Sequence, residues 1–247
     1  MLIGLMGAMP EEIEKIINSI QDKKETQNGN RVYHTGKLFG HNIVAVFSRW
    51  GKVAAATTAT DLIVNFKVDK IIFTGVAGAI SDDLNIGDVV IAERLFQHDM
   101  DARPLMKQFE IPLMNTTFFE IKKQENLKIL NAANNFIANN SDFKNKLSKS
   151  NINMPKVVVG DVASGDVFVA DIAIKQNIQK KLPSVLCVEM EGAAVAQVCN
   201  DFETPLNIVR VISDTATEKA SSHAMDFLNK YASDYSLGII KEYIQSL

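Results

Sequence analysis

The stretch SVLCVEMEGAAVAQVC, residues 184–199, joins an apolar run typical of a buried strand to an apolar run typical of a buried helix. Glu189 and Glu191 stand at the junction, on either side of Met190. A buried carboxylate keeps its charge only beside a partner. We therefore expect both glutamates to face a polar cleft or a ligand at the point where a strand gives way to a helix.

The same alternation of strand and helix patterns continues along the chain. Residues 2–7, LIGLMG, have the pattern of a short buried strand, and Pro10 then begins an amphipathic helix. Asn28-Gly29 marks a hairpin turn. Residues 70–80 predict a buried strand that ends in a loop rich in Gly and Ala. Further strands are expected over residues 31–37, 42–48, 86–95, 155–161 and 206–213, and further helices over residues 51–66, 170–181, 191–201 and 222–246.

Two segments lack this regularity. Residues 97–119 contain two prolines and show no clean period, which predicts a long loop. Residues 125–150 are polar and predict a surface helix with a linking segment. No internal repeat and no shift in composition marks a boundary. We therefore expect residues 1–247 to form one α/β domain with a central mixed, twisted sheet flanked by helices.

The composition argues against several classes of protein. Hydrophobic residues make up 47% of the 247 residues and charged residues 22%, as in ordinary globular proteins. The net charge of −3, without a stripe of Lys and Arg, argues against nucleic acid as a partner. No apolar run approaches the roughly 20 residues that span a bilayer, so no membrane is expected. Cys187 and Cys199 lie in apolar surroundings, which favours a reduced, cytoplasmic protein.

Acidic residues collect where strands are expected to end. Ligands of α/β sheets bind at the carboxyl ends of the strands. The acidic residues near these positions are Glu12, Asp166, Glu189, Glu191 and Asp214. Taken alone, Glu12 fits better in the first turn of a helix, where acidic side chains complement the dipole. Asp214 fits an N-cap or a turn as well as it fits a functional site.

Other chemical motifs are weak in this sequence. Gly75 and Gly78 fit either a plain tight turn or a loop small enough for a ligand's ring to approach the backbone. The chain lacks the dinucleotide, P-loop and GxSxG patterns. Its histidines have no metal-ligand spacing, so neither a metal nor a cofactor is implied; they are His34, His41, His98 and His223. With these motifs absent, the sequence favours acid–base chemistry by carboxyl groups.

Seven motifs, in this order, resemble those of the 5′-methylthioadenosine/S-adenosylhomocysteine nucleosidases, in the purine nucleoside phosphorylase-like superfamily. They are IGLMGAMPEE (3–12), GKVAAA (51–56), FTGVAGAI (73–80), IGDVV (86–90), SGDVF (164–168), VEMEGAAVA (188–196) and VRVISD (209–214). The resemblance covers essentially the whole chain. It implies a hydrolase that cleaves the N-ribosidic bond of 5′-substituted adenosines with water and releases adenine.

The resemblance also implies roles for individual residues. Glu12 would activate the water, assisted by Arg210, and Asp214, oriented by Ser213, would protonate the purine at N7. This division matches the reaction, in which positive charge develops on the sugar and negative charge on the leaving base. Glu191 would accept hydrogen bonds from the ribose hydroxyls. The other substrate-binding residues implied are Met190 and Glu189 at the sugar, Phe168 and Val169 at the adenine, Ala77 and Gly78 on the floor, and Met9 and Trp50.

Two positions depart from the family pattern. Val76 stands where many relatives carry a Ser that helps to hold the attacking water, and Trp50 stands where relatives often have a smaller apolar residue beside the 5′ substituent. The preference among 5′ substituents therefore stays open, and 6-amino-6-deoxyfutalosine is an alternative substrate. Relatives are commonly homodimers, and residues 103–119 are the expected donor of a contact to the neighbour's 5′ pocket.

Two further alternatives concern the reaction itself. Phosphorolytic relatives hold phosphate with arginines, one of them just before the glycine loop, where this chain has the apolar Phe73. Hydrolysis is therefore favoured, and Arg49 keeps phosphorolysis as an alternative. A non-catalytic nucleoside-binding or storage protein could share the scaffold. Against it stands the joint presence of four residues, which are Glu12, Glu191, Arg210 and Asp214.

Overall fold

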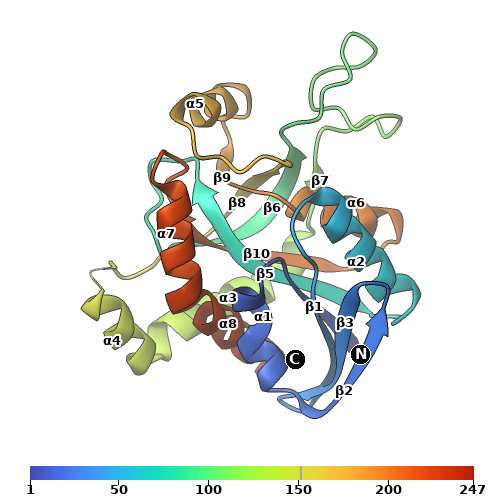
Figure 1. Ribbon diagram of the computed structural model, residues 1–247, viewed down its shortest axis with the longest axis vertical. Coiled ribbons are helices and arrows are strands. Elements are labelled where there is room, and N and C mark those ends of the chain that lie inside the picture. Colours follow the sequence, from blue (N-terminus) through green and yellow to red (C-terminus); the bar gives the residue numbers. More distant parts are fainter. Residues whose placement is uncertain (151) are drawn as a thin grey trace.

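One mixed sheet of ten strands runs through the computed structural model, which describes residues 1–150 and 152–247 (Figure 1). Its strands are β1 (Leu2–Gly7), β2 (Gln21–Asn28), β3 (Arg31–Leu38), β4 (His41–Phe47), β5 (Lys70–Ala79), β6 (Val89–Gln97), β7 (Phe119–Glu120), β8 (Val157–Ser164), β9 (Val185–Glu189) and β10 (Leu206–Asp214). Parallel and antiparallel pairs both occur, so the predicted mixed α/β architecture is confirmed.

Helices cover both faces of this sheet. They are α1 (Pro10–Asn18), α2 (Lys52–Val64), α3 (Lys123–Asn139), α4 (Ser141–Lys149), α5 (Ile172–Lys181), α6 (Gly192–Asp201), α7 (Ala220–Phe227) and α8 (Ser233–Gln245). One core lies between the sheet and α2 with α6, and a second lies between the sheet and α1, α3 and α8. Among the described residues, no helix is long and apolar enough to cross a membrane.

Strand β5 closes part of the sheet into a ring. On one side it pairs along its length with β10. On its other side it pairs first with β1, as far as Phe73, and then with β9, at Gly78 and Ala79. The strands β5, β10, β6, β8 and β9 therefore form a closed circuit of ladders. Between Phe73 and Gly78 one side of β5 has no ladder partner within residues 1–150 and 152–247, so backbone groups there are available to side chains.

The structure corrects several details of the expected elements. Strand β5 continues through Gly75 and Gly78, where we expected a loop, because β10 pairs with it across the whole segment. Residues 123–149 form two helices, and α3 buries an apolar face against α8. The single helix expected over residues 222–246 is α7 and α8 joined by a π-helical turn, Leu228–Ala232. The long loop between β6 and β7 and the hairpin turn after Asn28 are confirmed.

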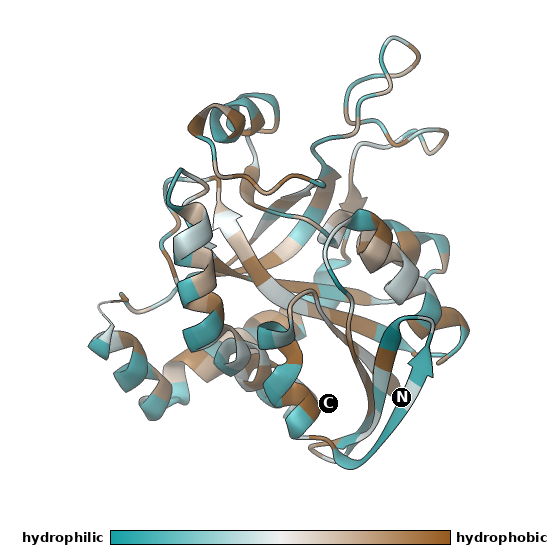
Figure 2. Cartoon of the chain, in the orientation of Figure 1, coloured by the Kyte–Doolittle hydropathy of each residue, from teal (hydrophilic) through white to brown (hydrophobic). Residues whose placement is uncertain are grey.

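The sequence pattern did not predict strand β2, nor the two-residue strand β7. All eight residues of β2 are exposed and most are polar, so it carries no apolar alternation (Figure 2). It forms because β3 offers an open edge with which its backbone can pair. Lysines on an edge strand are a common means of discouraging further pairing.

Candidate active site

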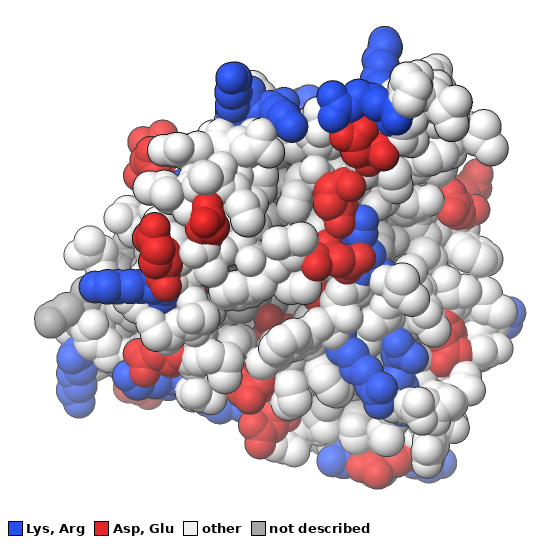
Figure 3. All heavy atoms as spheres, turned by 45° about the horizontal axis from the view of Figure 1, so that its top comes forward, with Lys and Arg blue, Asp and Glu red and all other residues white. Residues whose placement is uncertain are grey.

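The carboxyl ends of the strands surround one cavity of about 370 Å³. Figure 3 shows a hollow near the centre of this face of the molecule, with acidic side chains around it. All of the expected site residues line this cavity except Arg210, which is buried beneath it. Those lining it are Met9, Glu12, Trp50, Ala77, Gly78, Phe168, Val169, Glu189, Met190, Glu191, Ser213 and Asp214.

Glu12 is held in place by backbone donors from two elements. Its Oε2 accepts hydrogen bonds from the Ala8 and Met9 N–H groups at 2.7 and 2.8 Å. Its Oε1 accepts one from Val76, at 2.9 Å, in the unpaired part of β5. Glu12 therefore caps the helix, as the first-turn pattern indicated, and also reaches the cavity. Burial raises the pKa of Glu12, although the charge of Arg210 and the backbone donors act against the rise.

The glycines of β5 make room for protein carboxylates. A Cβ atom on Gly75 would lie 2.7 Å from the Glu12 Oε1, and one on Gly78 would lie 2.8 Å from the Asp214 Oδ1. A Cβ atom cannot approach an oxygen that closely without displacement of one of them. Our expectation that these small residues form a turn, or admit a ligand's ring, was therefore incomplete. They are the positions at which the two carboxylates pack directly against the backbone of β5.

Asp214 ends β10 on the opposite side of β5 from Glu12. Its Oδ2 accepts a hydrogen bond from the Ser213 hydroxyl and its Oδ1 accepts one from the Ala216 N–H, both at 2.8 Å. The side chain thus closes a local turn, which was the structural alternative, and it also lines the cavity. Burial raises the pKa of Asp214, and these two donors only partly oppose the rise. The protonated form of Asp214 is therefore more favourable than it is for an exposed aspartate.

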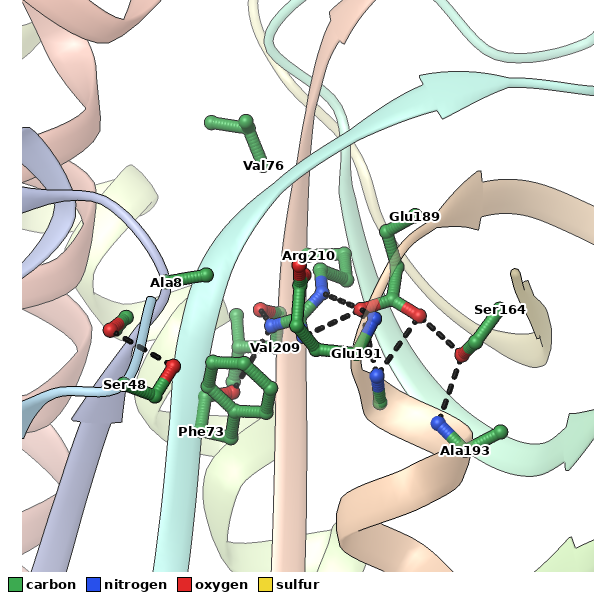
Figure 4. A network of polar contacts seen from close by, with 12 residues as sticks. Ala8, Ser48, Phe73, Val76, Ser164, Glu189, Glu191, Ala193, Val209 and Arg210 are labelled. Atoms are coloured by element: carbon green, nitrogen blue, oxygen red, sulfur yellow. Dashed lines mark hydrogen bonds and ion pairs between the residues drawn. The ribbon is translucent and has the colours of Figure 1, made fainter. Parts of the chain in front are cut away.

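Glu189 and Arg210 form a buried ion pair below the cavity (Figure 4). Arg210 is 1% exposed, and its Nη2 donates to the Glu189 Oε2 at 2.8 Å. Ser164 and the Gly192 N–H also donate to Glu189. Glu189 lies in the cavity wall, as expected, but its oxygens are engaged by the protein. The ring of Phe73 lies 4.1 Å from the guanidinium carbon of Arg210.

The charge of Arg210 is balanced by more than one carboxylate. Burial opposes that charge, but Glu189, Glu12 and Glu191 outweigh it and raise the pKa of Arg210. In the described part of the chain, the carboxyl group of Glu191 has one hydrogen-bond donor, the Gly51 N–H, which donates to its Oε1 at 2.8 Å. Burial and the neighbouring Glu189 raise the pKa of Glu191 to about 8. Glu191 therefore keeps capacity to bond a ligand, which Glu189 lacks.

Apolar side chains form the mouth of the cavity. Trp50 and Phe168 are 59% and 50% exposed although they are large and apolar. Helix α7 contributes a wall that the sequence reasoning missed, made of Ser221, Ala224, Met225 and, just beyond the helix, Leu228. A signal for it existed, because Ala220, Ala224 and Phe227 repeat at helical spacing and place Met225 beside a buried stripe.

The cavity has no cationic lining among the described residues. Phe73 is buried, and the exposed Arg49 donates from its guanidinium to the Asn30 carbonyl at 2.6 Å. In the described part of the chain, no group of three or more His, Cys, Asp or Glu side chains could hold a metal ion. The arrangement is suited to acid and base chemistry by carboxyl groups on an uncharged, largely apolar ligand.

Comparisons with known proteins agree with this geometry. Residues 2–245 match the model of the phosphorylase superfamily. A 5′-methylthioadenosine/S-adenosylhomocysteine nucleosidase of Staphylococcus aureus is 34% identical over 232 residues, which cover 94% of each chain. The nucleosidase of the same name from Neisseria meningitidis, solved with methylthio-immucillin-A, has a TM-score of 0.87 at 31% identity, with 100% of this chain and 99% of that chain covered.

A second solved structure carries a different name. The futalosine hydrolase of Helicobacter pylori has a TM-score of 0.84 at 33% identity, and the match covers 100% of this chain and 98% of that chain. The level of similarity is comparable with that of the nucleosidase structures. The chain belongs to the phosphorylase superfamily and, within it, to the family of 5′-methylthioadenosine/S-adenosylhomocysteine nucleosidases.

Proposed function

We propose that this protein hydrolyses the N-ribosidic bond of 5′-substituted adenosines, with 5′-methylthioadenosine and S-adenosylhomocysteine as substrates, and releases adenine and a 5′-substituted ribose. The observation that carries the proposal is a pair of carboxyl groups in one cavity: Glu12 packs against β5 at Gly75, and Asp214 packs against it at Gly78. Departure of a purine from ribose needs an acid beside the base and negative charge beside the sugar. Asp214 and Glu12 supply these two groups.

Asp214 is the general acid in this mechanism. Burial raises the pKa of this carboxyl group against the opposing effect of its two hydrogen-bond donors, and the carboxyl group delivers its proton to N7 of the purine. The bond between N9 and the anomeric carbon then breaks, and its electron pair stays on the base, which leaves as neutral adenine. General acid catalysis of this kind is worth about 100- to 10,000-fold in rate.

Glu12 is the general base on the sugar side. Three backbone N–H groups fix its carboxylate and leave it a lone pair for a water molecule. The water oxygen bonds to the anomeric carbon, and its proton passes to Glu12. Arg210 favours the ionised form of Glu12 through its charge. Val76 offers the water only an apolar side chain, so Glu12 holds it without the hydroxyl present in many relatives.

The remaining lining residues bind the substrate. Glu191 bonds the ribose hydroxyls with the capacity that its single protein partner leaves. Phe168 stacks on the adenine, and Val169 offers it backbone groups. Trp50, Met9 and the α7 wall surround the 5′ substituent. An apolar pocket suits a methylthio group, and no cofactor takes part in this scheme.

The test is adenine release from methylthioadenosine, S-adenosylhomocysteine and 6-amino-6-deoxyfutalosine side by side, each with and without phosphate. We expect release without phosphate, and no stimulation by it, because the described lining residues include no cation for a phosphate dianion. Release only with phosphate would make the protein a phosphorylase. No release from any substrate would support a nucleoside-binding role.

The similarity to the futalosine hydrolase favours a second candidate substrate class. The larger 5′ group of 6-amino-6-deoxyfutalosine would have to extend past Trp50 and Met225 at the mouth. If this class is the physiological one, the aminodeoxyfutalosine arm of the assay gives the highest kcat/KM. If methylthioadenosine leads, Trp50 limits the pocket to small substituents.

We also propose that the protein works as a cytoplasmic homodimer. The loop between β6 and β7 projects from the body of the molecule (Figure 1), and its Leu105 and Leu113 are 88% and 93% exposed. A second copy would bury these side chains. Cys187 and Cys199 are free and buried, as suits a reducing compartment. Light scattering at micromolar concentration tests the dimer; a fully active monomer would contradict it.

A further inference from the structure

Asp166 is a strand-end carboxylate that the reaction scheme does not use. It follows β8, and its Oδ1 accepts a hydrogen bond from the Lys52 N–H at 2.8 Å. Lys52 is the first residue of α2, whose N-cap residue, Gly51, has no side chain with which to cap the helix. Asp166 therefore supplies from a distant segment the acceptor that the helix start lacks.

A second carboxylate holds Asp166 and Lys52 together. The Asp99 Oδ1 accepts from the Lys52 Nζ at 2.6 Å, and its Oδ2 accepts from the Asp166 N–H at 2.9 Å. The Lys52 Nζ also reaches the Gln97 Oε1, at 3.1 Å. Three loops that follow β4, β6 and β8 are thus joined in one cycle of hydrogen bonds, which we call the loop clamp and define as Lys52, Asp99 and Asp166.

The loop clamp lies next to Gly51, the residue whose N–H binds Glu191. Gly51 donates its N–H to the Glu191 Oε1 at 2.8 Å, and the next N–H along the chain is the one that Asp166 accepts. Gly51 has a φ of 87° and leaves 3.0 Å between an ideal Cβ position and the Asp166 Oδ1. The two peptide groups that flank the Gly51 Cα are therefore both held, the Trp50–Gly51 peptide by Glu191 and the Gly51–Lys52 peptide by Asp166.

We propose that Asp166 is a positioning residue for Glu191: by holding the Lys52 N–H it fixes Gly51, so that the Gly51 N–H of the preceding peptide group orients the Glu191 carboxyl group toward the ribose hydroxyls. The inference rests on the proposed function, because it assigns Asp166 a role in binding the sugar. Since Asp166 also lies two residues before Phe168, the same clamp connects the adenine side of the cavity to the sugar side.

A purely structural role makes a different prediction. If Asp166 only completes the start of α2, its loss lowers stability and affects every substrate contact equally. If it acts through Glu191, its loss matters only while Glu191 can bond the ribose. A thermodynamic cycle between Asp166 and Glu191 separates the two roles, because residues that act through one another do not give additive effects.

The experiment compares Asp166→Ala, Glu191→Gln and the double variant, with kcat/KM for methylthioadenosine as the readout. We expect Asp166→Ala to lower kcat/KM about 10- to 100-fold, the effect of a small misplacement of a binding group. In the Glu191→Gln background the same substitution should cause little further loss. Asp166→Asn keeps an oxygen for the Lys52 N–H and should restore most of the activity.

Asn140→Ala is the matched control, since Asn140 caps α4 by accepting from the Phe143 N–H at 2.9 Å and does not line the cavity. It should lower the thermal midpoint as Asp166→Ala does and leave kcat/KM unchanged. Equal losses from Asp166→Ala in both backgrounds, or no loss in either, would overturn the inference while leaving the proposed function intact. A wild-type protein that releases no adenine would overturn both.

Discussion

Asp214 and Glu189 are both buried carboxyl groups in the wall of one cavity, and the protein treats them in opposite ways. Glu189 receives a guanidinium, a hydroxyl and backbone N–H groups, so its charge is neutralised and its oxygens are occupied. Asp214 receives one hydroxyl and one backbone N–H, and both donors are neutral. The first arrangement suits a structural role, and the second suits the general acid that we propose.

The largest expected effect comes from removing the transferable proton. Asp214→Asn keeps the shape and an acceptor for the Ala216 N–H but cannot protonate the purine. We expect kcat to fall about 100- to 10,000-fold with KM for methylthioadenosine little changed, as for the loss of a general acid. Unchanged turnover would remove Asp214 from the mechanism and erase the contrast with Glu189.

The next largest effect concerns the ion pair of Glu189 with Arg210 and its contribution to stability. Arg210→Met leaves Glu189 buried without its cation, and breaking a buried ion pair by removing one partner costs about 3 to 5 kcal/mol. We expect the free energy of unfolding, measured in urea, to fall by that amount. Adding Glu189→Gln should recover part of the loss. If Arg210→Met alone proved as stable as the wild type, the pair would have no structural role.

A smaller effect concerns Glu191, a third buried carboxyl group of the cavity wall. Its pKa is raised from 4.5 to about 8, so the folded protein binds a proton that the unfolded chain releases. This stabilisation is fully present below pH 4.5 and is lost as the pH rises through about 8. Thermal midpoints across this window should fall less steeply with pH in Glu191→Gln than in the wild type. Parallel curves would contradict the assignment.

The smallest effect concerns the contribution of Ser213 to the pKa of Asp214. The Ser213 hydroxyl stabilises the ionised form of Asp214 and so lowers its pKa. Ser213→Ala should raise that pKa further, and the basic limb of the kcat/KM profile should move to higher pH, since Asp214 acts with its proton bound. A limb that moves to lower pH would show that Ser213 serves the protonated form.

The sequence predicted the junctions better than it predicted the contacts. Runs such as residues 2–7 and 206–213 carry a period that burial imposes, so the mixed α/β sheet and the acidic strand ends could be read directly. Strand β2 could not, because its residues are exposed and only pairing with β3 makes it a strand. The same limit applies to the site, where the resemblance named Arg210 and Glu189 but only the fold shows that they bind each other.

Some features were hidden for a different reason. The contribution of α7 to the cavity depends on how the helix lies across β10, which its own amphipathic pattern does not specify. The need for Gly75 and Gly78 depends on carboxylates that are distant in sequence. Close approach between segments is a property of the assembled sheet, so composition alone could not distinguish it from a turn.

The unpaired side of β5 has a consequence for amide hydrogen exchange. Other residues of β5, up to Phe73, are paired with β1 on this side of the strand. The Val76 N–H instead donates to the Glu12 carboxylate. Its exchange with deuterium should therefore follow the state of a side chain, slowing while Glu12 is ionised and speeding up once Glu12 takes a proton. One amide in the middle of the sheet would then serve as a built-in reporter of the base during titration or ligand binding.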